Sequence, residues 1–387
     1  MILEDVTFID KVENETQTPP FYRSRIMKIT TDLNSFSTPA RVTTRSEHHA
    51  RSLAPLSRTV PLDLAIDFRE LTDNQVLKFN DDDGKVSAKL VRLARQFNDI
   101  TTDAIFRISV FQPPDSVLAI LSDQKKIKFA ESQAEFLQSR LGSNMITYPY
   151  LDLPVTDYKA FIDAHYLRTE NASTIFFFDM AMDSNNLRGL IDHIVKKEQP
   201  AIVGLKYRKW EDSIPQHRVV ASFFNNQRTA FFAAQVEREE PDTHVSNLHS
   251  VAFEWGLDFV SLNQPRGHPN KQKLNLNKIR MIDPNSLVIS NIEHTLADSN
   301  RNILGEFDIP LENFNDISFV QRVLRGYRGA KVHPKKFQTL FRLARTHEAI
   351  TSCKAFDTSR EKIPEKEQMK DYIDHTGLKL APLALAR

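Results

Sequence analysis

Eight short runs of apolar, β-branched or aromatic residues recur along this chain of 387 residues, and longer helical patterns separate them. Several of these runs are apolar throughout, which is expected of strands in a parallel sheet that helices cover on both faces. The runs occupy residues 40–44, 62–68, 104–111, 145–150, 174–179, 201–207, 229–236 and 257–262. Strands that alternate with helices in this way predict an α/β fold.

The segments between the runs predict helices at residues 85–97, 131–141, 158–165, 185–197 and 245–255. Eight strands alternating with helices favour a (β/α)8 TIM-like barrel over an open, doubly wound sheet. We therefore predict three parts of the chain: an N-terminal arm at residues 1–25, a TIM-like barrel with insertions at 26–330, and a C-terminal helical tail at 331–387 packed on the barrel. The tail's apolar stripe predicts a helix at 337–354.

Composition excludes several classes of function. The chain has 10 glycines and one cysteine, Cys353. It therefore contains no Gly-rich dinucleotide-binding or phosphate-binding loop, no internal disulfide and no multi-cysteine zinc site. Its 12 histidines show no metal-ligand spacing, so we expect no metal and no cofactor. No apolar run of about 18 residues is present, and the N-terminus lacks a signal-peptide pattern, so we expect no membrane partner and a cytoplasmic location.

Several short stretches, taken in order, resemble the tRNA-guanine transglycosylase superfamily. Leu257-Asp258-Phe259, followed by Pro265-Arg266, is similar to the strand that holds this family's nucleophile and the basic hairpin after it. The other stretches that carry the resemblance lie at residues 29–39, 131–146, 187–205 and 341–363. The resemblance implies a barrel that binds RNA, such as tRNA, or DNA. It also implies a glycosyl (pentosyl) transferase type of base exchange, and leaves open a homodimer or a heterodimer.

The chain departs from the family at the positions that carry its chemistry. Residues 107–112 stand where the family has a base-binding Asp-Ser-Gly-Gly-Phe-Gln loop, and Phe111 and Gln112 alone match it. The family's nucleophilic aspartate falls at about Val260 or Ser261, and its zinc cysteines are missing. Base exchange needs a carboxylate that attacks the sugar's anomeric carbon. The sequence therefore favours either a divergent base-modifying enzyme with a rearranged site or a catalytically inactive binding protein.

In a barrel, functional side chains follow the C-terminal ends of the strands. On this rule the predicted catalytic residues are Asp179 and Asp67, with structural alternatives: Asp179 capping the following turn, and Asp67 paired with Arg41, Arg45 or Arg69. The predicted substrate-binding residues are Phe111 and Gln112 from the resemblance, together with Lys206, Arg208, Asn263 and Arg266. Further polar residues at strand ends are Asp152, Asp183 and Glu237.

A basic block in the last third of the chain predicts a polyanionic partner. Residues 259–346 contain 14 Lys and Arg against 7 Asp and Glu, although the whole chain has a net charge of +1. Residues 259–282 and 317–346 contain no acid at all. Such stretches neutralise phosphates. The predicted nucleic-acid-binding residues are Lys271, Lys273, Arg325, Arg328, Lys335 and Lys336.

Two other functions fit the same residues. The first is a barrel enzyme acting on a small phosphorylated or anionic metabolite, which Lys206, Arg208 and Arg266 would grip while Asp179 or Asp67 serves as the base. Its predicted mark is a pocket at the strand C-termini with convergent carboxylates. The second is an oligomer-forming scaffold, which a barrel mouth filled by side chains would favour. A solvated basic face is the alternative to nucleic-acid binding.

Overall fold

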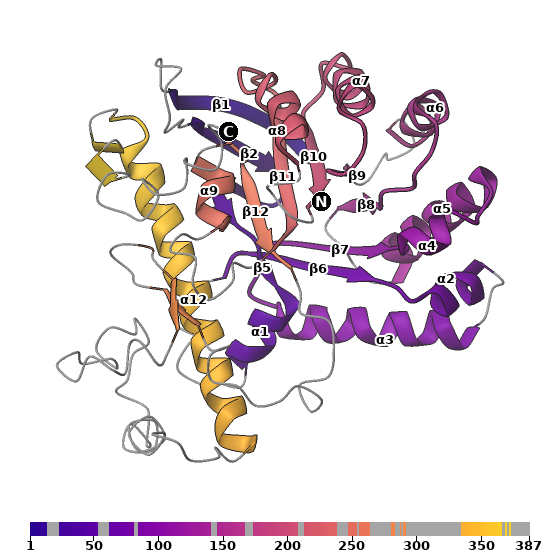
Figure 1. Ribbon diagram of the computed structural model, residues 1–387, viewed down its shortest axis with the longest axis horizontal. Helices are drawn as coiled ribbons and strands as arrows, with labels where there is room; N and C mark the ends of the chain where they lie inside the picture. The colour runs from indigo at the N-terminus through magenta and orange to yellow at the C-terminus, as the bar shows by residue number, and fades with distance from the viewer. Residues whose placement is uncertain are drawn as a thin grey trace.

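The computed structural model shows a mixed α/β fold in which helices surround a core of parallel strands (Figure 1). It describes residues 1–13, 23–52, 62–80, 84–140, 145–166, 173–207, 213–237, 247–253, 255–263, 280–282, 287, 289–291, 334–365, 368–369 and 371–372. No helix within these ranges is both long enough and apolar enough to span a membrane.

All eight predicted strands form. The larger sheet has six parallel strands in the order β4-β12-β11-β10-β9-β8. Their bounds are β4 (Ala40–Arg41), β8 (Ile146–Tyr148), β9 (Thr174–Asp179), β10 (Ala201–Lys206), β11 (Thr229–Val236) and β12 (Phe259–Leu262). A second parallel sheet has the order β5-β6-β7, with β5 (Thr43–Thr44), β6 (Leu64–Glu70) and β7 (Phe106–Gln112). Only Val42 separates β4 from β5, so the first predicted strand pairs with β12 at its start and with β6 at its end.

The closed sheet of the predicted barrel is not found, because no backbone ladder joins β7 to β8. Side chains bridge the two strands instead. The Thr147 hydroxyl of β8 donates to the carbonyl of Ser109 in β7 at 2.5 Å. The Gln133 carboxamide accepts from the Phe111 N–H at 3.1 Å and donates to the Thr147 carbonyl at 3.0 Å. We call this junction, made of β7, β8 and the side chains between them, the seam.

Both faces of the strands are buried, which explains why their sequences are apolar throughout. Phe68, Phe177 and Phe232 belong to one cluster of buried side chains to which β6, β7, β9, β10, β11 and β12 all contribute. Their neighbours in sequence, such as Phe176, Phe178 and Phe231, join a second cluster with residues of the covering helices. A parallel strand covered on both faces buries every side chain, and period-two alternation disappears.

Helices follow most of the strands and lie outside them (Figure 1). The predicted helices are found, with shifted ends, as α3 (Gly84–Ile100), α5 (Asp123–Arg140), α6 (Val155–Tyr166), α7 (Ser184–Val195), α9 (Asn247–Phe253) and α12 (Pro334–Lys362). The sequence interpretation missed the short helices α1 (Arg45–Ser52), α2 (Asp73–Asn80), α4 (Asp115–Leu118) and α8 (Ile214–Ala221). These have eight residues or fewer, too few for a clear 3.6-residue period.

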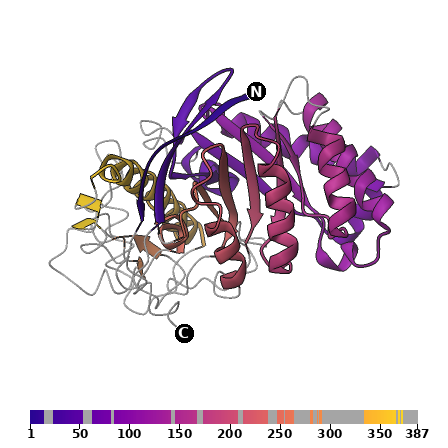
Figure 2. The same ribbon diagram turned by 90° about the horizontal axis from the view of Figure 1, so that it is seen from above.

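The N-terminal arm is an antiparallel hairpin of β1 (Leu3–Glu13) and β2 (Arg23–Thr31), extended by β3 (Ser35–Ser37). Figure 2 shows β1 and β2 running side by side. Val6 and Ile29 pack in the same cluster as the phenylalanines between the parallel strands. A small hairpin, β13 (Arg280–Ile282) with β14 (Ile289–Asn291), lies against α12. The hairpin of β1 and β2 therefore contributes side chains to the core.

Gly204 in β10 is required because an aromatic ring occupies the space of its missing side chain. A Cβ atom built there would lie 2.5 Å from the Phe177 ring. We expect Gly204→Ala to lower the free energy of unfolding by about 1–3 kcal/mol, the cost of overpacking a dense core. Urea unfolding followed by circular dichroism measures it. The matched control is Gly189→Ala in α7, where the nearest atom is 3.9 Å away and alanine is expected to stabilise the helix by up to about 1 kcal/mol. Equal stability of the Gly204 variant and the wild type would contradict this packing.

Candidate functional site

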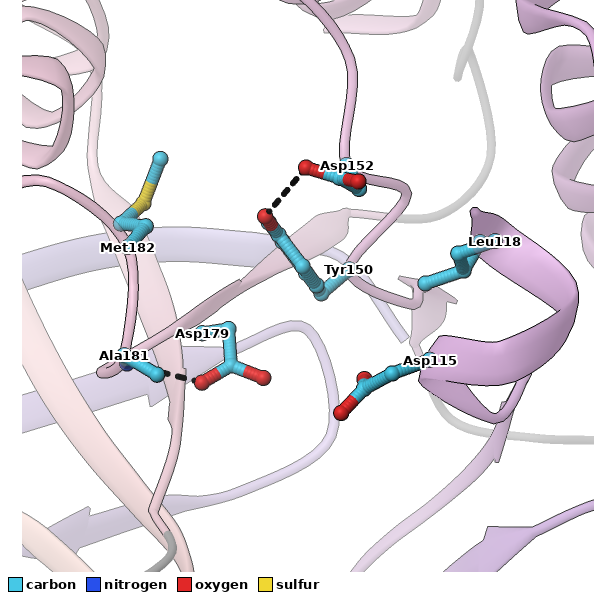
Figure 3. Close-up of a pocket in the computed structure, with 7 residues that line it drawn as sticks. All are labelled: Asp115, Leu118, Tyr150, Asp152, Asp179, Ala181 and Met182. Atoms are coloured by element: carbon cyan, nitrogen blue, oxygen red, sulfur yellow. Dashed lines mark hydrogen bonds between the residues drawn. The ribbon is translucent and has the colours of Figure 1, made fainter. Parts of the chain in front are cut away.

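A pocket of about 290 Å³ lies where β7, β8 and β9 end. Its lining comes from three consecutive strand-to-helix connections: Asp115 and Leu118 after β7, Tyr150 and Asp152 after β8, and Asp179, Ala181 and Met182 in and after β9. Figure 3 shows the carboxylates of Asp115 and Asp179 directed into the same space, with the Tyr150 ring beside them. The pocket therefore lies at the C-terminal ends of the parallel strands, as the sequence predicts for a functional site.

Local sequence explains how the first and last connections turn. Pro113 and Pro114 stop β7, because proline cannot continue a strand ladder, and Pro114 takes the extended conformation that precedes α4. At the end of β9, the Asp179 carboxylate accepts the Ala181 N–H at 2.8 Å. Asp183 then caps α7 by accepting the N–H groups of residues 185 and 186. Asp183 has the role of a helix cap, whereas Asp179 both caps its turn and lines the pocket.

Lys206 joins two of the carboxylates. Its ammonium nitrogen lies 3.2 Å from Asp179 Oδ2 and 3.6 Å from Asp115 Oδ1, and the lysine is 4% exposed. Asp179 is also buried, while half of the Asp115 side chain reaches solvent. A buried charge needs a partner of opposite sign, and this geometry supplies one for Lys206. Asp152 adds a third carboxylate to the lining, so among the described residues the lining of the pocket is acidic.

The carboxylates of the pocket affect the Tyr150 phenol. Its hydroxyl donates to Asp152 Oδ1 at 3.0 Å. Burial raises the pKa of the Tyr150 phenol well above its ordinary value, and the nearby carboxylates of Asp152, Asp179 and Asp115 raise it further. The phenol is therefore a neutral hydrogen-bond donor at any pH near neutrality, and its ring forms an apolar wall of the pocket.

Asp67 lies apart from the pocket lining and is engaged by arginine. Arg69 donates to Asp67 Oδ2 through Nη2 at 2.7 Å and through Nε at 3.2 Å. The Asp67 carboxylate is fully buried. This is a structural ion pair of the kind that the sequence offers as the alternative to a catalytic role, with Arg69 as one partner. Burial lowers the pKa of the Arg45 guanidinium, and the Asp67 charge also acts on this group by raising its pKa.

The remaining predicted substrate-binding and nucleic-acid-binding residues are not among the described residues that line the pocket. Phe111 is buried in a cluster with Phe129 and Phe136, and Gln112 is buried with its carboxamide bonded to the backbone of Tyr150. Asn263 follows β12, and its N–H donates to the Val236 carbonyl. Lys335 and Lys336 lie in the first turn of α12. Arg208, Arg266, Lys271, Lys273, Arg325 and Arg328 lie outside the described residues.

Two polar residues of the pocket, Asp115 and Tyr150, were missed by the sequence interpretation. Asp115 follows the predicted strand 104–111 after Pro113-Pro114, and it was not among the predicted site residues. Tyr150 lay inside a predicted strand that in fact ends at Tyr148. At the position where the resemblance puts a nucleophile, Val260 and Ser261 are both buried. Within the described ranges, no three His, Cys, Asp or Glu side chains are grouped to hold a metal ion.

A scan against models of known protein families and a search of curated proteins find no match to this chain.

Proposed function

We propose that the two parallel sheets are parts of one eight-stranded (β/α)8 barrel joined at the seam. Three features support this. The first strand pairs with both β12 and β6, which links the two sheets on one side. On the other side, Thr147 and Gln133 bridge β7 and β8. Finally, apolar side chains from both sheets meet in a single cluster between the strands, as in the filled interior of a barrel.

We propose further that this barrel takes a nucleobase into the pocket lined by Asp115, Tyr150, Asp152 and Asp179. The observation that carries the proposal is the convergence of three carboxylates on one small pocket. Carboxylates accept hydrogen bonds from amino and ring N–H groups, and an aromatic ring stacks on a flat base. A volume of about 290 Å³ is at the lower end for ligand pockets and suits a compact ligand.

The charge of the pocket favours a base over a phosphorylated or anionic metabolite. An anion entering it would meet Asp115, Asp152 and Asp179, and like charges at short range repel. Lys206, the described residue proposed to grip an anion, is 3.2 Å from Asp179 and lies between two carboxylates. Asp179 is then the residue that we expect to accept a base N–H, and any base-modifying reaction would use it as the proton acceptor.

Ligand-observed NMR tests this ligand class directly. Purine and pyrimidine bases would be compared with phosphorylated sugars at neutral pH and the same concentrations. We expect saturation transfer from the protein to at least one base and none to the sugar phosphates. Transfer to the sugar phosphates alone would overturn the proposal and favour the anionic-metabolite enzyme.

We propose that the base is presented by RNA or DNA. Support comes from the ordered resemblance to the transglycosylase superfamily and from the two acid-free basic stretches of the sequence. Filter binding with tRNA and single-stranded DNA tests it. We expect micromolar affinity that falls steeply as salt rises, because phosphate contacts release counterions. Absence of binding at low salt would end this part of the proposal.

A further inference from the structure

The segment between β8 and α6 carries two pocket residues, Tyr150 and Asp152, although it begins at the strand that has no ladder to β7. A short connection without neighbouring ladder bonds needs other contacts to keep its side chains in place. Two buried side chains from elsewhere in the chain supply them. Neither side chain is among the residues that line the pocket.

The first is Gln112, the last residue of β7. Its carboxamide donates to the Tyr150 carbonyl at 2.9 Å and accepts the Tyr150 N–H at 3.0 Å. It also donates to the carbonyl of Pro113 at 3.1 Å. Gln112 is fully buried. The side chain thus does for Tyr150 what a neighbouring strand would do, since it satisfies both backbone groups of one residue.

The second is Lys126 of α5, which is 7% exposed. Its ammonium group donates to the Asp152 carbonyl at 2.8 Å and to Asp123 Oδ1 at 3.0 Å. Asp152 has a φ of 50°, in the left-handed region that residues other than glycine rarely adopt. A strained backbone persists where its surroundings hold it, and the bond from Lys126 holds this one. In this conformation the Asp152 carboxylate reaches the Tyr150 hydroxyl.

We propose that Gln112 and Lys126 are positioning residues that hold Tyr150 and Asp152 in a preformed arrangement for the ligand. This inference rests on the proposed function in taking the pocket as the ligand site. It adds that affinity for the ligand depends on residues that do not touch it. By binding the backbone of Tyr150, Gln112 fixes where the tyrosine ring lies in the pocket. By binding the Asp152 carbonyl, Lys126 fixes the direction of the Asp152 carboxylate.

The chain offers a matched control for each residue. Gln133 is also a buried glutamine that makes two hydrogen bonds across the seam, but its partners are Phe111 and Thr147, which do not line the pocket. Lys125 is the exposed neighbour of Lys126 on α5. A purely structural role predicts that Gln112→Met and Gln133→Met behave alike. A positioning role predicts that they differ at the pocket.

The ionisation of Tyr150 reads out its position without any ligand. The protein would carry ¹³Cζ-labelled tyrosine, and Tyr150→Phe would assign the Tyr150 signal. In the wild type we expect no titration of this signal up to pH 11, because burial and three carboxylates raise the pKa of the phenol. In Gln112→Met and Lys126→Met the ring leaves the carboxylates and enters water, so its pKa returns toward about 10 and the signal titrates below pH 11. Lys126→Arg is expected to restore the wild-type behaviour, and Gln133→Met and Lys125→Met to keep it.

The affinity for the base found by ligand-observed NMR gives the second readout. We expect Gln112→Met and Lys126→Met to weaken it on the order of tenfold, because the pocket is no longer preorganised. An unchanged Tyr150 titration in both variants would overturn the positioning inference, whatever the ligand is. If Tyr150 titrates below pH 11 in both variants as expected, but the wild type binds no base, the positioning inference stands and the proposed function is overturned. Circular dichroism at each pH verifies that every variant is folded.

Discussion

Asp258→Asn is expected to lower the free energy of unfolding by about 3–5 kcal/mol, the cost of breaking a buried ion pair by removing one partner. The Asp258 carboxylate accepts hydrogen bonds from Arg25 Nε at 2.9 Å and from Arg25 Nη2 at 2.6 Å. Both side chains are almost completely buried. It also accepts the Phe231 N–H at 2.8 Å. Neutralising the carboxylate leaves a guanidinium group buried without its counter-charge. Urea unfolding at pH 7.5, followed by circular dichroism, measures the loss.

The same contact joins the N-terminal hairpin to the parallel strands. Arg25 of β2 donates to the carbonyls of Phe224, Asn226 and Thr229 as well as to Asp258. The matched control is Asp192→Asn, which removes an exposed carboxylate paired with Lys196 on α7 and is expected to change stability by about 1 kcal/mol or less. Equal effects of the two substitutions would show that the Arg25–Asp258 pair is not a buried link between hairpin and strands.

Acid is expected to destabilise this protein through two buried histidines. Burial lowers the pKa of His217 and of His249 to about 3. In the unfolded chain a histidine has a pKa of about 6.5, so between these values the unfolded state binds the proton. The stability that the neutral rings provide is complete above pH 6.5 and is lost as the pH falls. At pH 5 the loss is about 2 kcal/mol for each histidine, or about 4 kcal/mol for both.

His249 gives the sharper test because neither ring nitrogen has a hydrogen-bond partner among the residues that the structure describes. Its ring stacks on Phe356 with centroids 5.2 Å apart, and Arg41 lowers its pKa further. We expect His249→Phe to remove about half of the stability loss between pH 7.5 and pH 5. The readout is urea unfolding at both pH values. A variant with the same pH dependence as the wild type would place the acid sensitivity elsewhere.

The strands were predictable because burial on both faces gives them a simple signal. The predicted ranges 174–179 and 229–236 coincide with β9 and β11, whose residues are nearly all buried. The sequence pattern predicted a closed sheet, and the structure has two separate parallel sheets instead. At the seam no backbone ladder joins β7 to β8, and the side chains of Gln133 and Thr147 bridge the two strands. No propensity or period in the sequence marks where a ladder between neighbouring strands is missing.

The site was predictable in part. The rule that polar residues at strand ends carry function led to Asp179, Lys206 and Asp152, which the structure brings to one pocket or its edge. The contact between Lys206 and Asp179 was not predictable, because it depends on the register of β10 on β9, which places these two residues side by side. Because of this register, Lys206, which the sequence proposed as a phosphate-binding residue, forms an ion pair with the Asp179 carboxylate. The basic stretches that predict nucleic-acid binding lie for the most part outside the described residues.

Equilibrium dialysis of a nucleobase against wild type, Asp179→Asn and Asp192→Asn tests the central claim most directly. A hydrogen bond to a charged group contributes about 1.5–3 kcal/mol, so loss of the Asp179 carboxylate is expected to weaken binding by about tenfold or more. Asp192→Asn removes the same charge from an exposed site on α7 and should bind as the wild type does. If Asp179→Asn remains folded and binds the base with wild-type affinity, the pocket at the ends of β7, β8 and β9 is not the base-binding site.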